Sequence, residues 1–211
     1  MTAREEDILT SQNLIQQGTV IDKLLQSLIV DKSVKIDDML IGDKNAIMVS
    51  ARILGYGKEY EFTYDGEEQS VDLSKLEPVE LDFSKFTKGK NEFNFKLPNS
   101  EREVTFKLLT GGDEKKISSE IKAREKISKE QSSELTTRLK HMILSVDGNS
   151  EKTYVNHFVD NEFLSRDSLA FRQYLSSITP DVDMTTTVVD STGKETVVSV
   201  PVTIRFFWPS A

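Results

Sequence analysis

Cysteine is absent from all 211 residues of this chain, and histidine occurs only twice. Without a thiol the chain can form no disulfide, no cysteine nucleophile and no cysteine-ligated zinc site. The two histidines, His141 and His157, stand 16 positions apart, and neither has a second histidine three or four positions away. A pair of metal ligands on one helix needs that short spacing. We therefore expect both to be ordinary helix residues, and we expect no metal and no cofactor.

An excess of positive charge and long apolar runs are also missing. The formal net charge of −8 argues against non-specific nucleic-acid binding, which needs a cationic surface. The one lysine-rich stretch, residues 115–140, is interleaved with glutamates and is typical of a solvated helix face. No apolar run approaches the roughly 20 residues that span a bilayer, and the acidic first seven residues do not resemble a signal peptide. The expected location is the cytoplasm, without a membrane or nucleic-acid partner.

Motifs that carry catalysis are lacking too. The chain has no phosphate-binding loop, dinucleotide fingerprint, nucleophile elbow or zinc-protease motif. Asp181 and Asp183 alternate on one face of a predicted strand, as half of a cation site or an acid–base pair would. A charged strand edge that discourages edge pairing explains the same pattern and is favoured. The sequence predicts that the protein is not an enzyme, with a cation-dependent hydrolase using these two aspartates as the least favoured alternative.

What the sequence does contain is the pattern of an α+β fold made of helices and antiparallel hairpins. A helix over residues 44–54, expected to bury Ile47, Met48, Ala51 and Leu54, is followed by an alternating strand, an Asp65-Gly66 turn and a return strand. A further hairpin is predicted around residues 98–101.

A second helix-plus-hairpin unit is predicted near the C-terminus. A helix over residues 166–177 precedes two strands that turn at residues 190–193. A shift of 122 positions places Ile47 on Leu169 and Tyr60 on Val182, so helix falls on helix and strand on strand. An internal duplication explains this pattern, and so do two independent helix–hairpin units.

These elements predict four parts: an N-terminal helix over residues 1–30, a first α+β unit with an extra hairpin over 31–112, a connecting helix and linker over 113–134, and a second α+β unit over 135–211. The linker is placed at residues 131–134. The N-terminal helix has Leu14 and Leu25 on its apolar face, and Gly18-Thr19 is the point where it could be interrupted. It would either pack on its own domain or act as a docking arm or oligomer contact.

The second unit is predicted to end in a strand that carries Phe206, Phe207, Trp208 and Pro209. On a strand, Phe206 and Trp208 share one face and Phe207 lies on the other. One face would close the core, the commoner outcome, and the other would contact a partner. The predicted partner-binding residues are these four together with Leu14 and Leu25.

Residues 36–209 resemble the T4-type baseplate hub and hub-assembly proteins of contractile-tailed bacteriophages. The resemblance is carried by residues 39–43 (MLIGD), 51–52 (AR), 55–57 (GYG), 71–73 (VDL), 97–98 (LP), 108–110 (LLT), 113–114 (DE), 139–143 (LKHMI), 147–148 (DG), 180–183 (PDVD) and 206–209 (FFWP). Relatives of this kind often carry paired cysteines at the hairpin turns. Here the turns read Asp-Gly-Glu-Glu from residue 65 and Asp-Ser-Thr-Gly from residue 190, so zinc is not carried over.

The resemblance implies a late, non-catalytic viral protein that helps to build the baseplate hub in the host cytoplasm. Its partners would be other hub or tail-initiator proteins, or further copies of itself, and it would either stay in the virion baseplate or leave as an assembly factor. The alternative is a chaperone for a tail protein that is absent from the finished particle.

Overall fold

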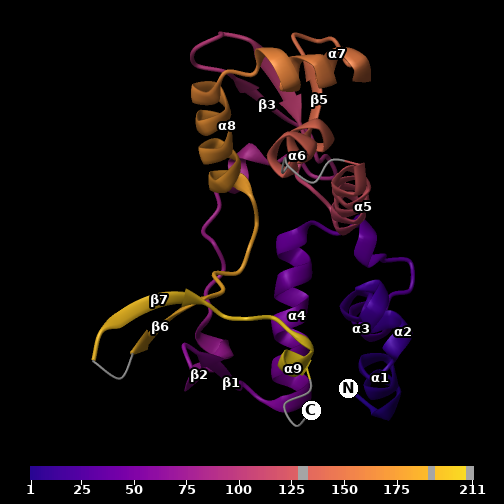
Figure 1. Ribbon diagram of the computed structural model, residues 1–211, viewed down its shortest axis with the longest axis vertical. Helices are drawn as coiled ribbons and strands as arrows, with labels where there is room; N and C mark the ends of the chain where they lie inside the picture. The colour runs from indigo at the N-terminus through magenta and orange to yellow at the C-terminus, as the bar shows by residue number, and fades with distance from the viewer. Residues whose placement is uncertain (128–132, 190–192, 208–211) are drawn as a thin grey trace. The chain divides into compact units, whose positions relative to one another are not determined.

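The computed structural model describes residues 1–127, 133–189 and 193–207, and its fold is α+β (Figure 1). The chain forms two compact units, and both are discontinuous in sequence. Unit 1 consists of Met1–Ile36, Gly42–Val79 and Asp181–Ala211, and unit 2 consists of Asp37–Ile41 and Glu80–Pro180.

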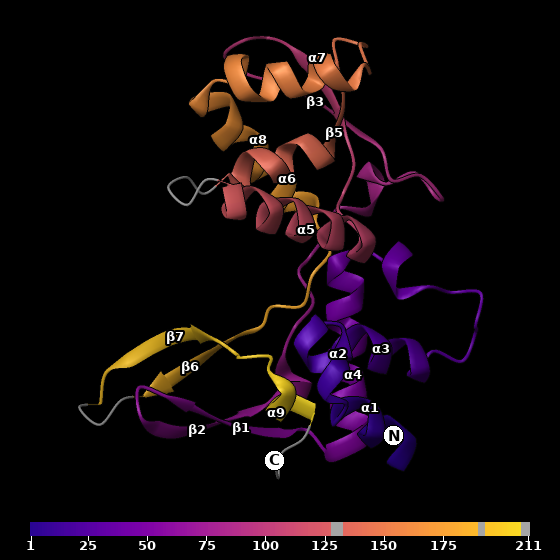
Figure 2. The ribbon, with the colours of Figure 1, turned by 45° about the vertical axis from the view of Figure 1, so that its right-hand side comes forward.

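Unit 1 combines a helical N-terminal part with two separate two-stranded antiparallel hairpins (Figures 1 and 2). Its helices are α1 (Ala3–Leu9), α2 (Gln12–Gln17), α3 (Val20–Leu28), α4 (Ile41–Tyr56) and α9 (Ile204–Phe207), and its strands are β1 (Glu59–Tyr64), β2 (Glu67–Asp72), β6 (Thr185–Val189) and β7 (Glu195–Ser199).

A single helix over residues 1–30 is wrong, because the structure has three short helices there, but one of the two breaks falls at the expected interruption, Gly18-Thr19. Thr2 and Glu5 form a reciprocal capping box that starts α1, with the Thr2 backbone N–H donating to Glu5 Oε2 over 2.8 Å. Gly18 ends α2 with a φ of 68°, a left-handed conformation that most residues avoid and that a helix C-cap often uses. The turn at Gly18 redirects the chain so that Leu9, Leu24 and Leu25 are all buried.

The β1–β2 hairpin matches its prediction. Asp65 and Gly66 both have positive φ, 49° and 83°, which is the requirement of the two-residue turn whose twist fits a hairpin. Tyr60 and Phe62 are buried while Glu61 between them is exposed, as a strand with one core face requires.

Unit 2 is a three-stranded antiparallel sheet of order β3-β4-β5 packed with helices (Figures 1 and 2). Its core includes Phe106 of the sheet, Phe158 and Phe171, each at most 1% exposed. The elements are β3 (Phe93–Lys96), β4 (Glu103–Phe106), α5 (Gly111–Ile127), α6 (Glu134–Met142), β5 (Ile143–Val146), α7 (Lys152–His157), which continues into a π-helical turn (Phe158–Glu162), and α8 (Ser165–Ile178).

Two element predictions in unit 2 differ in outcome. The hairpin around residues 98–101 is confirmed as β3–β4. The apolar residues of 135–144 predict a helix over that range, but helix α6 ends at Met142, since Ile143 is extended and residues 143–146 pair with β4 as strand β5. The apolar run across this boundary fits a helix or a strand equally well, so only the pairing with β4 decides it.

The predicted domain boundaries also differ from the structure. Residues 113–127 of the predicted connecting segment form most of α5, which packs against α6 through Ile117 and Met142 inside unit 2. Half of the predicted linker, residues 131–132, lies outside the described residues, while Ser133 is the N-cap of α6 and Glu134 begins that helix.

The second predicted helix-plus-hairpin unit exists in element order but not as one packed unit. Helix α8 belongs to unit 2, and the β6–β7 hairpin belongs to unit 1. Between them the chain pairs with an earlier segment, because the Val79 N–H donates to the Asp181 carbonyl and the Asp183 N–H donates to the Glu77 carbonyl, over 2.9 and 2.8 Å. This long-range pairing returns the chain to unit 1 and separates the hairpin from its preceding helix.

Candidate functional site

The aromatic end of the chain was the first predicted contact site, and its described part is buried. Residues 204–207 form the short helix α9 rather than a strand, so the predicted division of Phe206 and Phe207 between two faces is wrong. Both side chains are 0% exposed, and the Phe206 ring lies edge-on to Tyr60 with 4.9 Å between centroids. These two residues close the core of unit 1, while Trp208 and Pro209 lie outside the described residues.

The N-terminal residues chosen as contacts are also turned inward. Leu25 of α3 is 0% exposed and Leu14 of α2 is half-buried, so the helical arm packs on its own unit. The structure therefore favours the packed alternative over the docking arm for this segment. A contact surface on unit 1 must therefore consist of other residues, whose side chains are exposed.

Asp181 and Asp183 serve local polar contacts. Asp181 Oδ1 accepts from Asn45 Nδ2 over 3.0 Å and from the Val182 N–H over 2.8 Å. Asp183 Oδ1 accepts from the backbone N–H and the hydroxyl of Thr185, over 3.0 and 2.7 Å, where β6 begins. Within the described ranges no group of three or more His, Asp or Glu side chains could hold a metal ion. The pair shapes the entry into β6.

An apolar groove of about 380 Å³ opens on unit 1 beside α4. Its most prominent side chain is Leu54, which is 85% exposed although α4 buries Met48, Val49 and Arg52 on its other side. We call this surface the α3–α4 groove, and its lining residues are Met1, Leu28, Ala46, Ile47, Ser50, Ala51 and Leu54.

The predicted burial of Leu54 is wrong for a reason that the sequence contains. Apolar residues of α4 occur all around the helix, because Ile47 and Leu54 lie two turns apart on one face while Val49 lies on the opposite face. One core can cover only one stripe of a helix, so an apolar residue on the far side stays open unless a second surface covers it. The spread of apolar positions was the signal for an additional surface.

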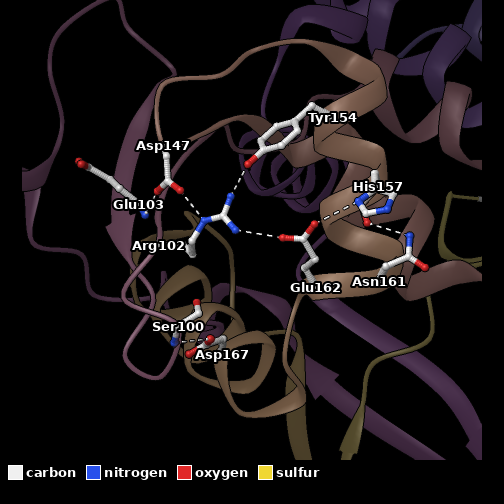
Figure 3. A network of polar contacts seen from close by, with 9 residues as sticks. All are labelled: Ser100, Arg102, Glu103, Asp147, Tyr154, His157, Asn161, Glu162 and Asp167. Atoms are coloured by element: carbon white, nitrogen blue, oxygen red, sulfur yellow. Dashed lines mark hydrogen bonds and ion pairs between the residues drawn. The ribbon is translucent and has the colours of Figure 1, made fainter.

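A polar network in unit 2 was not predicted at all (Figure 3). Arg102, just before β4, donates through Nε to Asp147 and through Nη1 to Glu162 Oε2 over 3.0 Å. Its third contact is to the Tyr154 hydroxyl, and the guanidinium lies 5.2 Å from the Phe158 ring centroid. The network joins the start of β4, the turn after β5 and the helices that follow.

The same network includes one histidine, and its contacts favour the ionised form of Asp147. His157 Nδ1 lies 3.1 Å from Glu162 Oε1. The Glu103 N–H and then the Arg102 guanidinium lower the pKa of Asp147. We call this network the clamp, and its five members are Arg102, Asp147, Tyr154, His157 and Glu162. The side chains of Asp147 and Glu162 remain partly exposed.

Below the clamp, a buried carboxylate fixes the β3–β4 turn to α8 (Figure 3). Asp167 is 0% exposed and accepts from the backbone N–H and the side-chain amide of Asn99, over 2.7 and 2.9 Å, and from the Ser100 N–H over 3.0 Å. Burial raises the pKa of Asp167, but these donors outweigh it and the net shift is downward. The turn residues at 98–101 were recognised in the sequence, but their distant partner in α8 gave no local signal.

No protein-family model, curated protein or solved structure matches this chain. Among the described residues, no helix is long and apolar enough to cross a membrane.

Proposed function

We propose that this protein acts in assembly of the baseplate hub of a contractile-tailed phage, through protein–protein contacts rather than catalysis. The family resemblance over residues 36–209 supports this role. The observation that carries the contact is Leu54, 85% exposed on an apolar groove. Burying one leucine side chain against a partner contributes about 1.5–3 kcal/mol, so a residue left this open is a strong candidate for an interface centre.

The partner that suits this groove is a helix of another hub or tail-initiator protein. Ala46, Ser50 and Leu54 follow one another at one-turn intervals along α4, with the small Ala46 and Ser50 leaving room for a closely packed neighbour. A partner helix would present apolar residues at three- and four-residue spacing, the pattern that helix-in-groove recognition uses.

The test is a tagged copy of the chain recovered from infected cells, with the co-purifying proteins identified by mass spectrometry. We expect hub or tail proteins with the unaltered chain and about a tenfold or greater loss with Leu54→Asp. Leu169→Asp is the matched control, because Leu169 of α8 is 50% exposed and lies outside the groove. Equal recovery of tail proteins with Leu54→Asp would refute the groove.

Mass spectrometry of purified virions separates the two forms of the proposal. A hub subunit stays in the particle, whereas an assembly factor or chaperone is absent from it. Recovery of partners that are not tail proteins would contradict the assembly role itself.

A further inference from the structure

The β6–β7 hairpin of unit 1 (Figure 1) has one covered face and one open face. Val188 and Val198 are buried on the covered face, at 4% and 9% exposed. The open face carries six exposed residues, Thr185, Thr187, Val189, Glu195, Val197 and Ser199. Val197 lies opposite Thr187 at the centre of the ladder and is 68% exposed. The hairpin therefore packs on its unit through one face only.

The outer edge of β7 is also unpaired. Among the described residues, β6 and β7 pair only with each other. The Val200 N–H donates to the Met184 carbonyl over 2.7 Å, which makes these two residues a hydrogen-bonded pair and fixes the alternation along the ladder. Glu195, Val197 and Ser199 fall at the alternate positions, so their backbone N–H and C=O groups point away from β6. No backbone group in the described ranges bonds to them.

An open edge of this kind is a template for another extended strand, and natural proteins usually protect it with charge, proline or a covering segment. On the β6 edge the Thr185 N–H donates to Asp183 Oδ1 over 3.0 Å, so that edge is capped. On β7 the only charged residue, Glu195, begins the strand, the centre is Val197, and Pro201 comes after the strand has ended. The edge of β7 therefore fits a backbone in extended conformation.

We propose that β7 pairs with β7 of a second copy of this chain, antiparallel about a two-fold axis at Val197. This register places Val197 opposite its counterpart and Glu195 opposite Ser199 of the second copy, so no like charges face each other. Centring the pair on Glu195 would oppose two glutamates. Centring it on Ser199 would place Pro201, which has no N–H, opposite Val197.

The register about Val197 is the one that pairs all three outward residues of β7 with one another. It joins two hairpins into a four-stranded sheet, and a two-stranded hairpin gains stability from added strands. The contact is isologous, because the same edge serves both copies. A second copy is therefore the occupant whose sequence is known to match this edge.

The contact predicts a weak dimer that depends on concentration, because three residue pairs bury far less than the roughly 1,200–2,000 Å² of a stable interface. Sedimentation velocity of the purified chain over a concentration series measures it. Val197→Lys should weaken the dimer about fivefold or more, since two lysines would face each other at the axis. Val189→Lys is the matched control, because it changes the same residue type on the same face of the hairpin but on β6.

Cross-linking tests the register. The chain has no cysteine, so Val197→Cys provides one thiol per copy. Opposite residues of a hydrogen-bonded pair have Cα atoms about 5.5 Å apart, within disulfide range. Oxidised glutathione should link two copies of Val197→Cys, whereas Val189→Cys should stay monomeric, because the two β6 strands would lie about 14 Å apart. Glu195→Cys and Ser199→Cys should each stay monomeric alone and should link when mixed.

A chain that remains monomeric at about 1 mM overturns the proposal. Equal linking of Val197→Cys and Val189→Cys also overturns it, because random collision would then explain both. A dimer that Leu54→Asp abolishes and Val197→Lys leaves intact would place the self-contact in the α3–α4 groove instead. These measurements contain no tail protein, so the dimer can fail while the Leu54 pull-down succeeds, and the reverse result is equally informative.

Discussion

At the scale of single residues, Phe206 and Phe207 matter as core side chains. Both are 0% exposed, and their rings lie 5.1 Å apart in an edge-to-face arrangement. Phe207→Ala should lower the free energy of unfolding of unit 1 by about 3–5 kcal/mol, because it removes a large buried ring and leaves a cavity. Urea unfolding monitored by circular dichroism measures the change.

Phe83→Ala is the control for this substitution, since Phe83 is 76% exposed and its loss should change stability by less than about 0.5 kcal/mol. Similar unfolding curves for Phe207→Ala and Phe83→Ala would show that Phe207 is not a core residue, and would restore its original assignment to a partner surface.

Asp167 makes a pH-dependent contribution to the stability of unit 2. Its folded pKa lies below the ordinary value of 3.8, so its stabilisation is fully present above that value and is lost as the pH falls through the folded pKa. Asp167→Asn should cost roughly 1–3 kcal/mol at neutral pH, because part of the acceptor set for Asn99 and Ser100 is lost. The difference between variant and wild type should narrow as the pH falls below 3.8.

Urea unfolding over a pH series measures this effect, with Asp7→Asn at an exposed position as the control. A stability difference that is independent of pH would mean that the Asp167 charge contributes nothing, and that only the shape of the side chain matters.

At the scale of elements, the β1–β2 turn is the local feature with the clearest physical requirement. Gly66 has a φ of 83°, and a Cβ built there meets nothing within 4 Å, so only backbone strain opposes a side chain. Gly66→Ala should therefore destabilise unit 1 by about 1–2 kcal/mol. Gly66→Asn should cost less, because asparagine tolerates the left-handed conformation. Thermal unfolding of wild type and both variants measures these differences. Equal melting temperatures for Gly66→Ala and wild type would show that the Gly66 backbone conformation imposes no strain on alanine.

The elements also show how far sequence reasoning reaches. The β1–β2 and β3–β4 hairpins follow from alternation and turn residues, which act within a few positions. Strand β5 and helix α9 do not, because short, mostly apolar segments such as residues 142–146 and 204–207 are compatible with more than one structure. Neighbours distant in sequence decide them, β4 for the first and Tyr60 for the second.

The candidate site residues also differ in whether the sequence alone can identify them. Phe206, Phe207 and Leu25 were chosen for being apolar, yet an apolar residue is suited equally to a core and to an interface. Leu54 and Val197 stand out only once burial is known, since the exposure of an apolar side chain is a property of packing. Asp167 lies 68 positions from its partner Asn99, and no local pattern connects them.

At the scale of the whole molecule, each unit has a core of its own although neither is continuous in sequence. Phe171 lies in the core of unit 2, and Phe207 is buried in unit 1. The chain therefore places two separate sets of packed side chains on one polypeptide, and a defect in one core should be felt mainly in that unit.

Native-state hydrogen exchange tests this separation with a reciprocal pair of variants. In Phe207→Ala, amide exchange at Tyr60 and Val71, which pair in the β1–β2 hairpin, should accelerate about a hundredfold or more, as expected for a loss of at least roughly 3 kcal/mol. Exchange at Val104 and Val146, paired in the unit 2 sheet, should stay close to wild type. In Phe171→Ala, amide exchange should accelerate at Val104 and Val146 and stay close to wild type at Tyr60 and Val71. The reason is that Phe171 packs edge-on against Phe106 in the core of the unit 2 sheet. Equal acceleration at all four amides in either variant would show that the two cores unfold together as one cooperative body.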